Sequence, residues 1–530
     1  MNHREFRVLF LSLVLFLGSI SVQAQEPYDY VIRGGKFIDG TGNPSRSADI
    51  AIHDGRIAVI GRVTGVGRKE VDANGLVIAP GFIDVHTHAE GIEDLPEADN
   101  FLRMGVTTLV LGNCGSSRLN LGEYFYKLEQ LAISPNITSL IGHGTVRAEA
   151  MGGSFDRAPT GSELQTMKHL IQRAMYDGAL GMSTGLIYLP GTFADTEELI
   201  TLAQVVSDAD GIYASHMRNE GRRILSALEE LFQIAEKAKV RAHVSHIKLS
   251  GKASWGKTEA VLKVIHEARK RGLDITQDQY MYAASSTGIQ SRIPNWAREG
   301  GREEFLKRLS DPVVKKRMIV DLKEDLKQYG HEDFSYAMIA NYQHDSSLNG
   351  MNISQAAAKV FGTNSLDDQI ELILQIYENG GASGVFHSMN ENDLKEYLRH
   401  PNTMIAADSG VRKYNEGVPH PRGYGNNARC LARFVRELKF LPIEDAIRRM
   451  TFLPATVFGI RNRGVIRVGL PADLVVFDPG LVADQATFTE PHHYATGFRM
   501  VMVNGVPVVE NDVHNGSKPG KIIRSSSYRK

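Results

Sequence analysis

The fold is decided by residues 211–278, which read GIYASHMRNEGRRILSALEELFQIAEKAKVRAHVSHIKLSGKASWGKTEAVLKVIHEARKRGLDITQD. Short apolar segments alternate here with segments in which apolar residues recur at helical spacing, for example at Leu225, Leu228, Leu231 and Phe232. The predicted order is strand 211–216, helix 222–240, strand 241–246, helix 259–272 and strand 273–278. Such alternation predicts parallel strands joined by crossover helices, and therefore an α/β sheet or barrel.

Polar side chains at the strand ends distinguish a barrel from an open sheet. They are spread along most of the chain, at His86, His88, Cys114, His216, His246, Asp278 and Asp408. A TIM barrel takes its catalytic groups from the C-terminal ends of many strands, whereas an open doubly wound sheet gathers them at one switch point. The spread therefore predicts a TIM-like (β/α)8 barrel.

The two ends of the chain have a different pattern of apolar residues and glycines from the middle. Residues 28–80 and 464–510 read as short alternating strands broken by glycine turns. Neither stretch is long enough to bury a strong core alone, so we expect them to pair in one small β domain. The predicted organisation is a first half of this domain at 25–80, a barrel at 81–455, and a second half with a tail at 456–530. Within the barrel, the charged helical stretches at 285–380 predict an insertion beside the rim.

The first 24 residues predict a cleavable export signal. Arg4 and Arg7 precede the apolar run LFLSLVLFLGSI and then SVQA, which places cleavage after Ala24 and predicts a periplasmic or secreted protein. The run is shorter than the roughly 20 apolar residues of a membrane-spanning helix. An uncleaved interfacial anchor is the alternative. No later stretch is apolar enough to predict a membrane span.

Composition restricts the class of partner. The chain has 530 residues, of which 42% are hydrophobic and 23% charged, as in ordinary globular proteins. Lys plus Arg (60) almost cancels Asp plus Glu (61), so there is no electrostatic argument for nucleic-acid binding. We therefore expect no nucleic-acid partner.

The segment APGFIDVHTH (79–88) is the strongest local signal for chemistry. His86 and His88 are two residues apart on a predicted strand, so their side chains share one face and can converge on one ion. The other candidates follow or end apolar strands, and the full predicted ligand set is His86, His88, Cys114, His216, His246 and Asp408. Imidazole and thiolate ligands favour Zn²⁺ over Ca²⁺ or Mg²⁺, which take oxygen ligands.

Several of these residues have a second interpretation. Asp408 could cap a helix that begins at Ser409, and Cys114 could form a disulfide with Cys430, which an exported protein permits. His243 is three residues before His246 on the same strand and so faces the other way, which predicts a packed histidine. We expect three further histidines to be hydrogen-bonded structural residues, namely His143, His387 and His420.

Taken together, the motifs resemble those of the amidohydrolase superfamily, and within it the D-aminoacylase (N-acyl-D-amino-acid deacylase) group. PGFIDVHTH resembles the first-strand motif of the superfamily, and GVIRVGLPADLVVFD (464–478) resembles the return into its small β domain. GALGMSTGLIYLPG (178–191), SHMRNEG, SHIKLSGK and HPRGYG resemble the narrower group. Many superfamily members bridge two metals with a carboxylated lysine. This chain has no lysine at the corresponding strand end but has Cys114 in LGNCG, as in the D-aminoacylase group.

The resemblance implies a role for each matching position. It places a tightly bound zinc on Cys114, His216 and His246, and a second, weaker metal on His86, His88 and Asp408. It assigns Lys248, Tyr280 and Arg422 to the α-carboxylate of the substrate. Two departures concern the substrate pocket: Met281 stands where the group has proline in Tyr-Pro-Tyr, and the loop SGVRKYNEGVPHPRG after Asp408 is long and basic.

The activity implied is zinc-dependent hydrolysis of the amide bond of N-acyl-D-amino acids, which releases a D-amino acid and a carboxylate. Asp408 would act as general base and then as general acid, and Arg422 would grip the α-carboxylate through its two-pronged guanidinium. One alternative is a cyclic amidohydrolase (hydantoinase- or dihydroorotase-like) or a dipeptidase, because one fold hosts many substrates. Another is an exported zinc-binding protein without turnover, against which the presence of Asp408 counts.

Overall fold

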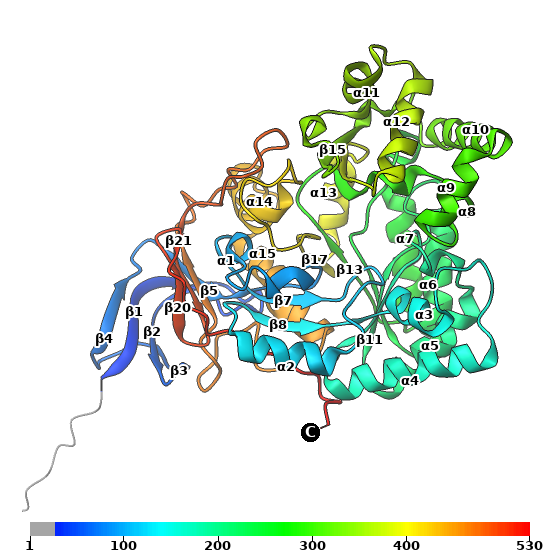
Figure 1. Cartoon of the computed structure of the whole chain (residues 1–530). Coiled ribbons are helices and arrows are strands. Elements are labelled where there is room, and N and C mark those ends of the chain that lie inside the picture. Colours follow the sequence, from blue (N-terminus) through cyan, green and yellow to red (C-terminus); the bar gives the residue numbers. More distant parts are fainter. Residues whose placement is uncertain (1–26, 530) are drawn as a thin grey trace, which may run out of the picture.

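The computed structural model describes residues 27–529 (Figure 1). The export signal predicted at 1–24 lies outside the described residues. In the part of the chain that the structure describes, no helix is both long and apolar enough to cross a membrane.

The N- and C-terminal segments share one nine-stranded sheet, whose order is β21-β20-β19-β18-β5-β1-β2-β3 with β4 beside β1. Its strands are β1 (Tyr28–Phe37), β2 (Arg46–His53), β3 (Arg56–Gly61), β4 (Gly67–Asp72), β5 (Val77–Pro80), β18 (Leu474–Phe477), β19 (Phe498–Val503), β20 (Val506–Glu510) and β21 (Val513–His514). The two segments meet where β5 pairs antiparallel with β18, and Ile50, Ile78, Leu474 and Met502 contribute to a common core. The blue and red strands lie side by side in Figure 1. The predicted small β domain is confirmed.

The middle of the chain forms the predicted barrel. Its parallel strands are β6 (Phe82–Asp84), β7 (Val106–Leu111), β8 (Asn136–Ser139), β9 (Ile141–Gly142), β10 (Gly181–Gly185), β11 (Ile212–His216), β12 (Arg241–Val244), β13 (Ile275–Gln279) and β17 (Thr403–Ile405). Only Leu140 separates β8, which pairs with β7, from β9, which pairs with β10. Counted as one strand position, β8 and β9 complete a ring of eight within the described residues.

A seam between the first and last strands closes this ring. The Asp408 N–H donates to the His86 carbonyl oxygen at 2.9 Å, and the His88 N–H donates to the Ser409 carbonyl oxygen at 2.8 Å. Below them, Asp84 accepts hydrogen bonds from the backbone N–H groups of His86 and Ala407 at 3.0 and 2.9 Å. The closure of the barrel therefore runs through the segments that carry three of the predicted ligands.

Helices surround the barrel because each buries an apolar stripe against it. They are α1 (Asp99–Leu102), α2 (Leu121–Leu131), α3 (His143–Met151), α4 (Gly161–Asp177), α5 (Thr196–Asp208), α6 (Ile224–Ala238), α7 (Thr258–Lys270), α13 (Glu391–Arg399), α14 (Arg422–Arg429) with the π-helix Cys430–Glu437, α15 (Ile443–Met450) and α16 (Phe452–Val457). In α6, Leu228, Leu231 and Phe232 are buried as predicted, but Leu225 is 45% exposed. Leu225 lies just beyond the edge of the buried face.

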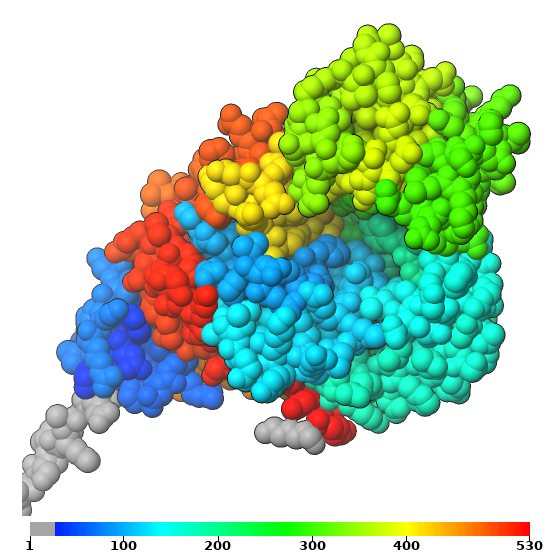
Figure 2. Space-filling view, in the orientation of Figure 1, coloured from blue at the N-terminus to red at the C-terminus, as the bar shows by residue number. Residues whose placement is uncertain are grey.

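Between β13 and β17 the chain forms an insertion with its own core, as the charged stretch predicted. It contains a three-stranded antiparallel sheet and five helices, namely β14 (Ser285–Gly288), α8 (Asn295–Arg298), α9 (Arg302–Ser310), α10 (Pro312–Gln328), β15 (Ala337–Asn341), α11 (Ile353–Phe361), α12 (Leu366–Glu378) and β16 (Ser383–Phe386). Asp311 separates α9 from α10, because its side chain accepts hydrogen bonds from the first N–H groups of α10 and Pro312 follows it. Figure 2 shows this green insertion overhanging the barrel.

Candidate metal centre

All six predicted ligands come together at the C-terminal ends of the barrel strands. His86 and His88 follow β6, Cys114 follows β7, His216 ends β11, His246 follows β12 and Asp408 follows β17. Their ligand atoms form overlapping groups within 4.8 Å, namely His86, Cys114 and His246, then His86, His88 and Asp408, and then His216, Glu220 and His246. The groups share His86 and His246, so the six residues form one continuous cluster.

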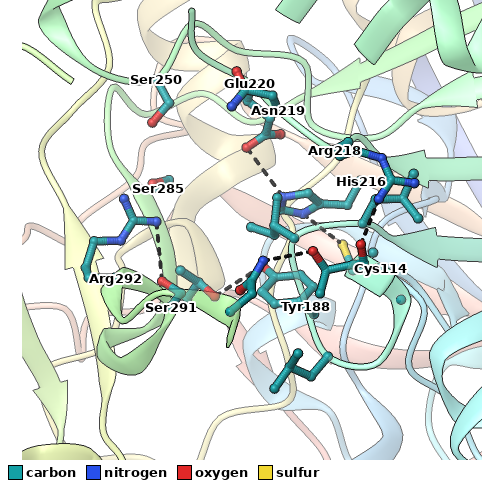
Figure 3. Close-up of a pocket in the computed structure, with 18 of the residues that line it drawn as sticks. Cys114, Tyr188, His216, Arg218, Asn219, Glu220, Ser250, Ser285, Ser291 and Arg292 are labelled. Carbon is teal, nitrogen blue, oxygen red and sulfur yellow. Dashed lines mark hydrogen bonds and ion pairs between the residues drawn. The ribbon is translucent and has the colours of Figure 1, made fainter. Parts of the chain in front are cut away.

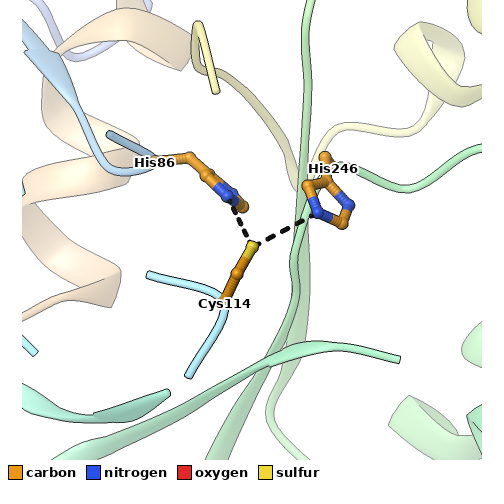
Figure 4. A group of neighbouring side chains, drawn as sticks. All are labelled: His86, Cys114 and His246. Carbon is orange, nitrogen blue, oxygen red and sulfur yellow. Dashed lines mark hydrogen bonds between the residues drawn. The ribbon is translucent and has the colours of Figure 1, made fainter. Parts of the chain in front are cut away.

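Cys114 lies at the centre of the histidines (Figure 4). Its Sγ is 3.3 Å from His86 Nε2, 3.5 Å from His246 Nε2 and 3.7 Å from His216 Nδ1. Burial alone would raise the pKa of this thiol, but the positive charges of His86 and His246 lower it well below its usual value. Cys114 and Cys430 are both free, so Cys114 is not in a disulfide. A thiolate among imidazoles is a donor set that suits Zn²⁺.

Asp408 connects this thiolate cluster to a cation. Its Oδ1 is 3.2 Å from His88 Nε2 and 3.5 Å from His86 Nε2, and its Oδ2 is 2.9 Å from Arg422 Nη2. Burial would raise the pKa of Asp408, but Arg422 and His86 hold it well below its usual range. No helix begins after Asp408, which removes its interpretation as a helix cap. The side chain is therefore an ionised carboxylate that faces the histidines.

Three of the predicted ligands have a left-handed backbone, with φ of 52° at Cys114, 37° at His246 and 51° at Asp408. This region costs a residue other than glycine about 1–2 kcal/mol. Such strain persists where the surrounding structure enforces it, and it is concentrated at functional sites. At each of the three positions the chain turns sharply at the end of a strand, and the side chain points into the cluster.

Asp278 fixes the outer side of the cluster. Its Oδ2 is 3.2 Å from His86 Nδ1 and 2.7 Å from His243 Nε2, and its Oδ1 accepts a hydrogen bond from the His246 backbone N–H at 3.0 Å. His243 thus faces Asp278 and Thr276 rather than the ligand atoms. A carboxylate on the far nitrogen of an imidazole sets the tautomer and orientation of a metal-binding histidine.

The residues predicted to hold the substrate carboxylate lie around the cluster. Arg422 Nη1 is buried and has no hydrogen-bond partner among residues 27–529, and the guanidinium lies 4.4 Å from the Tyr280 ring centroid. The Tyr280 hydroxyl donates to Met389 Sδ at 3.1 Å, while Lys248 Nζ contacts Glu220 and His246. Their role toward a substrate stays a prediction. Met281, the departure in this segment, is buried and its backbone contacts Asn426 on α14.

A cavity of about 1390 Å³ opens onto the cluster between the barrel rim and the insertion (Figure 3). Three of its polar residues had no role in the sequence-based prediction. Tyr188 packs against the His216 ring at 4.9 Å and accepts a hydrogen bond from Thr287, and Arg292 comes from the insertion. Glu220 is the fourth residue after His216 in SHMRNEG, and this His-x-x-x-Glu spacing is the signal that could have identified it.

Three other histidines make contacts outside the metal groups. His143 Nε2 is 2.8 Å from Glu198 Oε1, and His387 packs against Phe488 with ring centroids 4.7 Å apart. His420 bonds the Ala284 carbonyl oxygen and accepts from the Arg422 backbone N–H at 3.0 Å. His420 therefore fixes the start of α14, from which Arg422 reaches Asp408.

Comparison with known proteins agrees with this geometry. Residues 69–509 match the model of the amidohydrolase family. D-aminoacylase of Alcaligenes xylosoxydans xylosoxydans is 33% identical to the chain, with 95% of this chain and 99% of the relative covered. N-acyl-D-glutamate deacylase of the same organism is 32% identical, with 94% and 97% covered.

Solved structures give the same assignment. The crystal structure of N-acyl-D-glutamate deacylase from Bordetella bronchiseptica, complexed with zinc and a phosphonate that mimics the tetrahedral intermediate, superposes with a TM-score of 0.81 at 33% identity and covers 94% of this chain and 100% of the other. L-hydantoinase from Arthrobacter aurescens, at 15% identity and a TM-score of 0.52, shares the fold alone. From the strand-end ligands, the small β domain and these matches, we conclude that the chain belongs to the amidohydrolase family.

Proposed function

We propose that this protein hydrolyses the amide bond of N-acyl-D-amino acids with zinc as cofactor, and releases a D-amino acid and a carboxylate. The observation that carries the proposal is the buried Cys114 thiolate among imidazoles, beside an Asp408 carboxylate that is paired with Arg422. Relatives at 30–33% identity over more than nine-tenths of the chain are deacylases of N-acyl-D-amino acids.

The donor set fits zinc. Cys114, His216 and His246 would hold the tightly bound ion, and His86, His88 and Asp408 would hold a second, weaker one. When bound, zinc activates water and polarises the amide carbonyl group. The low pKa of Cys114 supports this assignment, because the thiolate is the form that binds metal.

Asp408 is placed to move a proton at one defined atom. Its Oδ2 is ion-paired with Arg422 at 2.9 Å, so Oδ1, which faces His88 and His86, is the oxygen that would take a proton from the attacking water. The same oxygen then gives the proton to the leaving nitrogen. Acid–base groups of this kind contribute typically about 10²–10⁴-fold to the rate.

The charged groups around the cluster favour an N-acyl-amino acid over a hydantoin. The buried Arg422 Nη1 has no hydrogen-bond partner within residues 27–529, and it can bind one oxygen of an α-carboxylate. Lys248, which lines the cavity over the cluster, adds a second positive charge. A hydantoin carries no free carboxylate, and it would leave this donor unpaired.

The test is a panel of N-acyl-D-amino acids, N-acyl-L-amino acids and hydantoins offered to zinc-loaded protein. We expect release of free amino acid from the D-series and no opening of hydantoins. Faster opening of hydantoins would overturn the proposal in favour of a cyclic amidohydrolase. Zinc binding with no hydrolysis of any substrate would support the alternative hypothesis of an exported zinc-binding protein without catalytic turnover.

We also propose that the protein is exported and that residues 1–24 are removed near Ala24. The support is the charged start and short apolar run of the sequence. Amino-terminal sequencing of the protein purified from its producing cells should begin at Gln25, and an intact Met1 would contradict this.

A further inference from the structure

We propose that Glu220 is a positioning residue, which holds the two imidazoles of the tightly bound zinc and links them to Lys248. This inference rests on the zinc assignment in the proposed function, but it does not depend on the identity of the substrate. Glu220 is buried on the loop between β11 and α6, and it lines the cavity beside His216 (Figure 3).

In His216 and in His246, one ring nitrogen faces Cys114 and the other faces Glu220. His216 Nδ1 and His246 Nε2 face Cys114 Sγ. Their opposite nitrogens face Glu220, with His246 Nδ1 2.9 Å from Oε1 and His216 Nε2 3.5 Å from Oε2. His216 Nε2 is buried and has no hydrogen-bond partner in the described part of the chain, so Glu220 is the acceptor within its reach.

This division fits one tautomer of each ring. An imidazole that gives one nitrogen to a metal carries its proton on the other, and that N–H needs an acceptor. One carboxylate offers an oxygen to each of the two rings. Glu220 therefore fixes both tautomers and both ring orientations at once.

Lys248 argues against Glu220 as a direct metal ligand. The Lys248 ammonium lies 2.5 Å from Glu220 Oε1 and 2.9 Å from His246 Nδ1. It contacts two members of the group His216, Glu220 and His246, and a metal ion held by the same atoms would be repelled by this second cation. The cation of this group is the lysine itself.

The same contacts connect the zinc position to the cavity. Lys248 Nζ is within hydrogen-bond distance of Glu220 Oε1, His246 Nδ1 and the His246 carbonyl oxygen, which uses all three of its N–H groups. When His246 Nδ1 carries its proton and donates to Glu220, it cannot accept from Lys248. One N–H of Lys248 is then left without this partner, beside the cavity that Lys248 lines.

The decisive experiment measures zinc affinity by competition with a chelator in wild type and in Glu220→Gln. The amide keeps the shape but has one oxygen and one NH₂ group, so it cannot accept from both rings. We expect zinc binding to weaken about 10–100-fold and the visible spectrum of the Co²⁺-substituted protein to change. Glu220→Asp, which keeps the charge, should recover part of the affinity and of the spectrum.

The matched control is Glu198→Gln, because Glu198 is also buried and bonds a histidine, His143, outside the metal cluster. It should leave zinc affinity and the Co²⁺ spectrum unchanged. Wild-type affinity and spectrum in Glu220→Gln would overturn the proposal, as would an equal loss in the control.

Wild-type protein gives a second test if Glu220→Gln does not fold. In a zinc-loaded crystal structure, the Glu220 carboxylate should lie within hydrogen-bond distance of both histidine nitrogens that are not bound to zinc. Direct coordination of zinc by Glu220 would refute its positioning role. If wild type binds zinc but hydrolyses no N-acyl-D-amino acid, the proposed function fails while these measurements still decide the role of Glu220.

Discussion

Replacing Arg422 with lysine tests whether this guanidinium grips the α-carboxylate of the substrate. One arm of Arg422 is already used, because Nη2 forms an ion pair with Asp408 Oδ2 at 2.9 Å. The other arm, Nη1, is buried without a hydrogen-bond partner among the described residues. Lysine can keep the contact with Asp408, but its single ammonium group cannot reproduce the second arm.

The expected loss is therefore one charge-assisted hydrogen bond to the substrate. Such a bond contributes about 1.5–3 kcal/mol, which corresponds to roughly a 10- to 150-fold fall in kcat/KM. Any disturbance of Asp408 would add a further loss, but that loss would be shared by every substrate. The specific signature is a change in the ratio between a substrate with the α-carboxylate and its α-carboxamide analogue.

The assay measures kcat/KM for both substrates in zinc-loaded wild type and Arg422→Lys. The control is Arg429→Lys on the same helix, because Arg429 also pairs with an aspartate, Asp484, and lies over a tyrosine ring, that of Tyr282. The carboxylate preference should fall in Arg422→Lys and persist in Arg429→Lys. Equal fold-changes for the two substrates in Arg422→Lys would remove Arg422 from the substrate site.

Three further predictions concern the metal, the base and the stability of the barrel. Cys114→Ala should lose most of the tightly bound zinc in metal analysis, whereas Cys430→Ala, which removes the other buried thiol, should retain it; full zinc content in Cys114→Ala would contradict the ligand assignment. Asp408→Asn should lower kcat by about 10²–10⁴-fold with the tight zinc retained; near-normal kcat would place the base elsewhere, with His387 the first candidate. Glu198 is buried, which raises its pKa, but the hydrogen bond and charge of His143 and the charge of Arg147 hold that pKa below its ordinary 4.5. The ionised Glu198 therefore stabilises the fold fully above about pH 4.5, and this stabilisation is lost as the pH falls through the lower pKa of the folded state. Over that pH interval the free energy of unfolding, measured by chemical denaturation, should fall less in Glu198→Gln than in wild type. Parallel pH profiles of the two proteins would refute this.

The fold was largely predictable because its signals are local. Strand–helix alternation at 211–278 predicted the barrel, and the short alternating strands broken by glycine turns at 28–80 and 464–510 predicted the small β domain. Both are present in the structure. The interior of the insertion was less accessible, because its strands β14, β15 and β16 pair across long connections. Pairing of that kind leaves little periodicity in the sequence.

The site was predictable in its ligands and less so in the groups that support them. His86 and His88 are identified by their spacing, and Cys114 by its place after a strand. Glu220 and Tyr188 were quoted within motifs but had no assigned role, since a lone carboxylate or phenol in a loop does not reveal its partner. That Lys248 contacts Glu220, and that one arm of Arg422 is bound by Asp408, depend on three-dimensional packing.

The seam that closes the barrel also sets the order in which the site can assemble. His88 and Asp408 are 320 residues apart in the chain, and they meet only where the last strand reaches the first. A partly synthesised or partly folded chain therefore lacks the His86, His88 and Asp408 site until its final strand is in place. An ion bound there would hold the first and last strands of the barrel together. Because a ligand that binds only the folded state stabilises that state by mass action, zinc should raise the free energy of unfolding of the closed barrel.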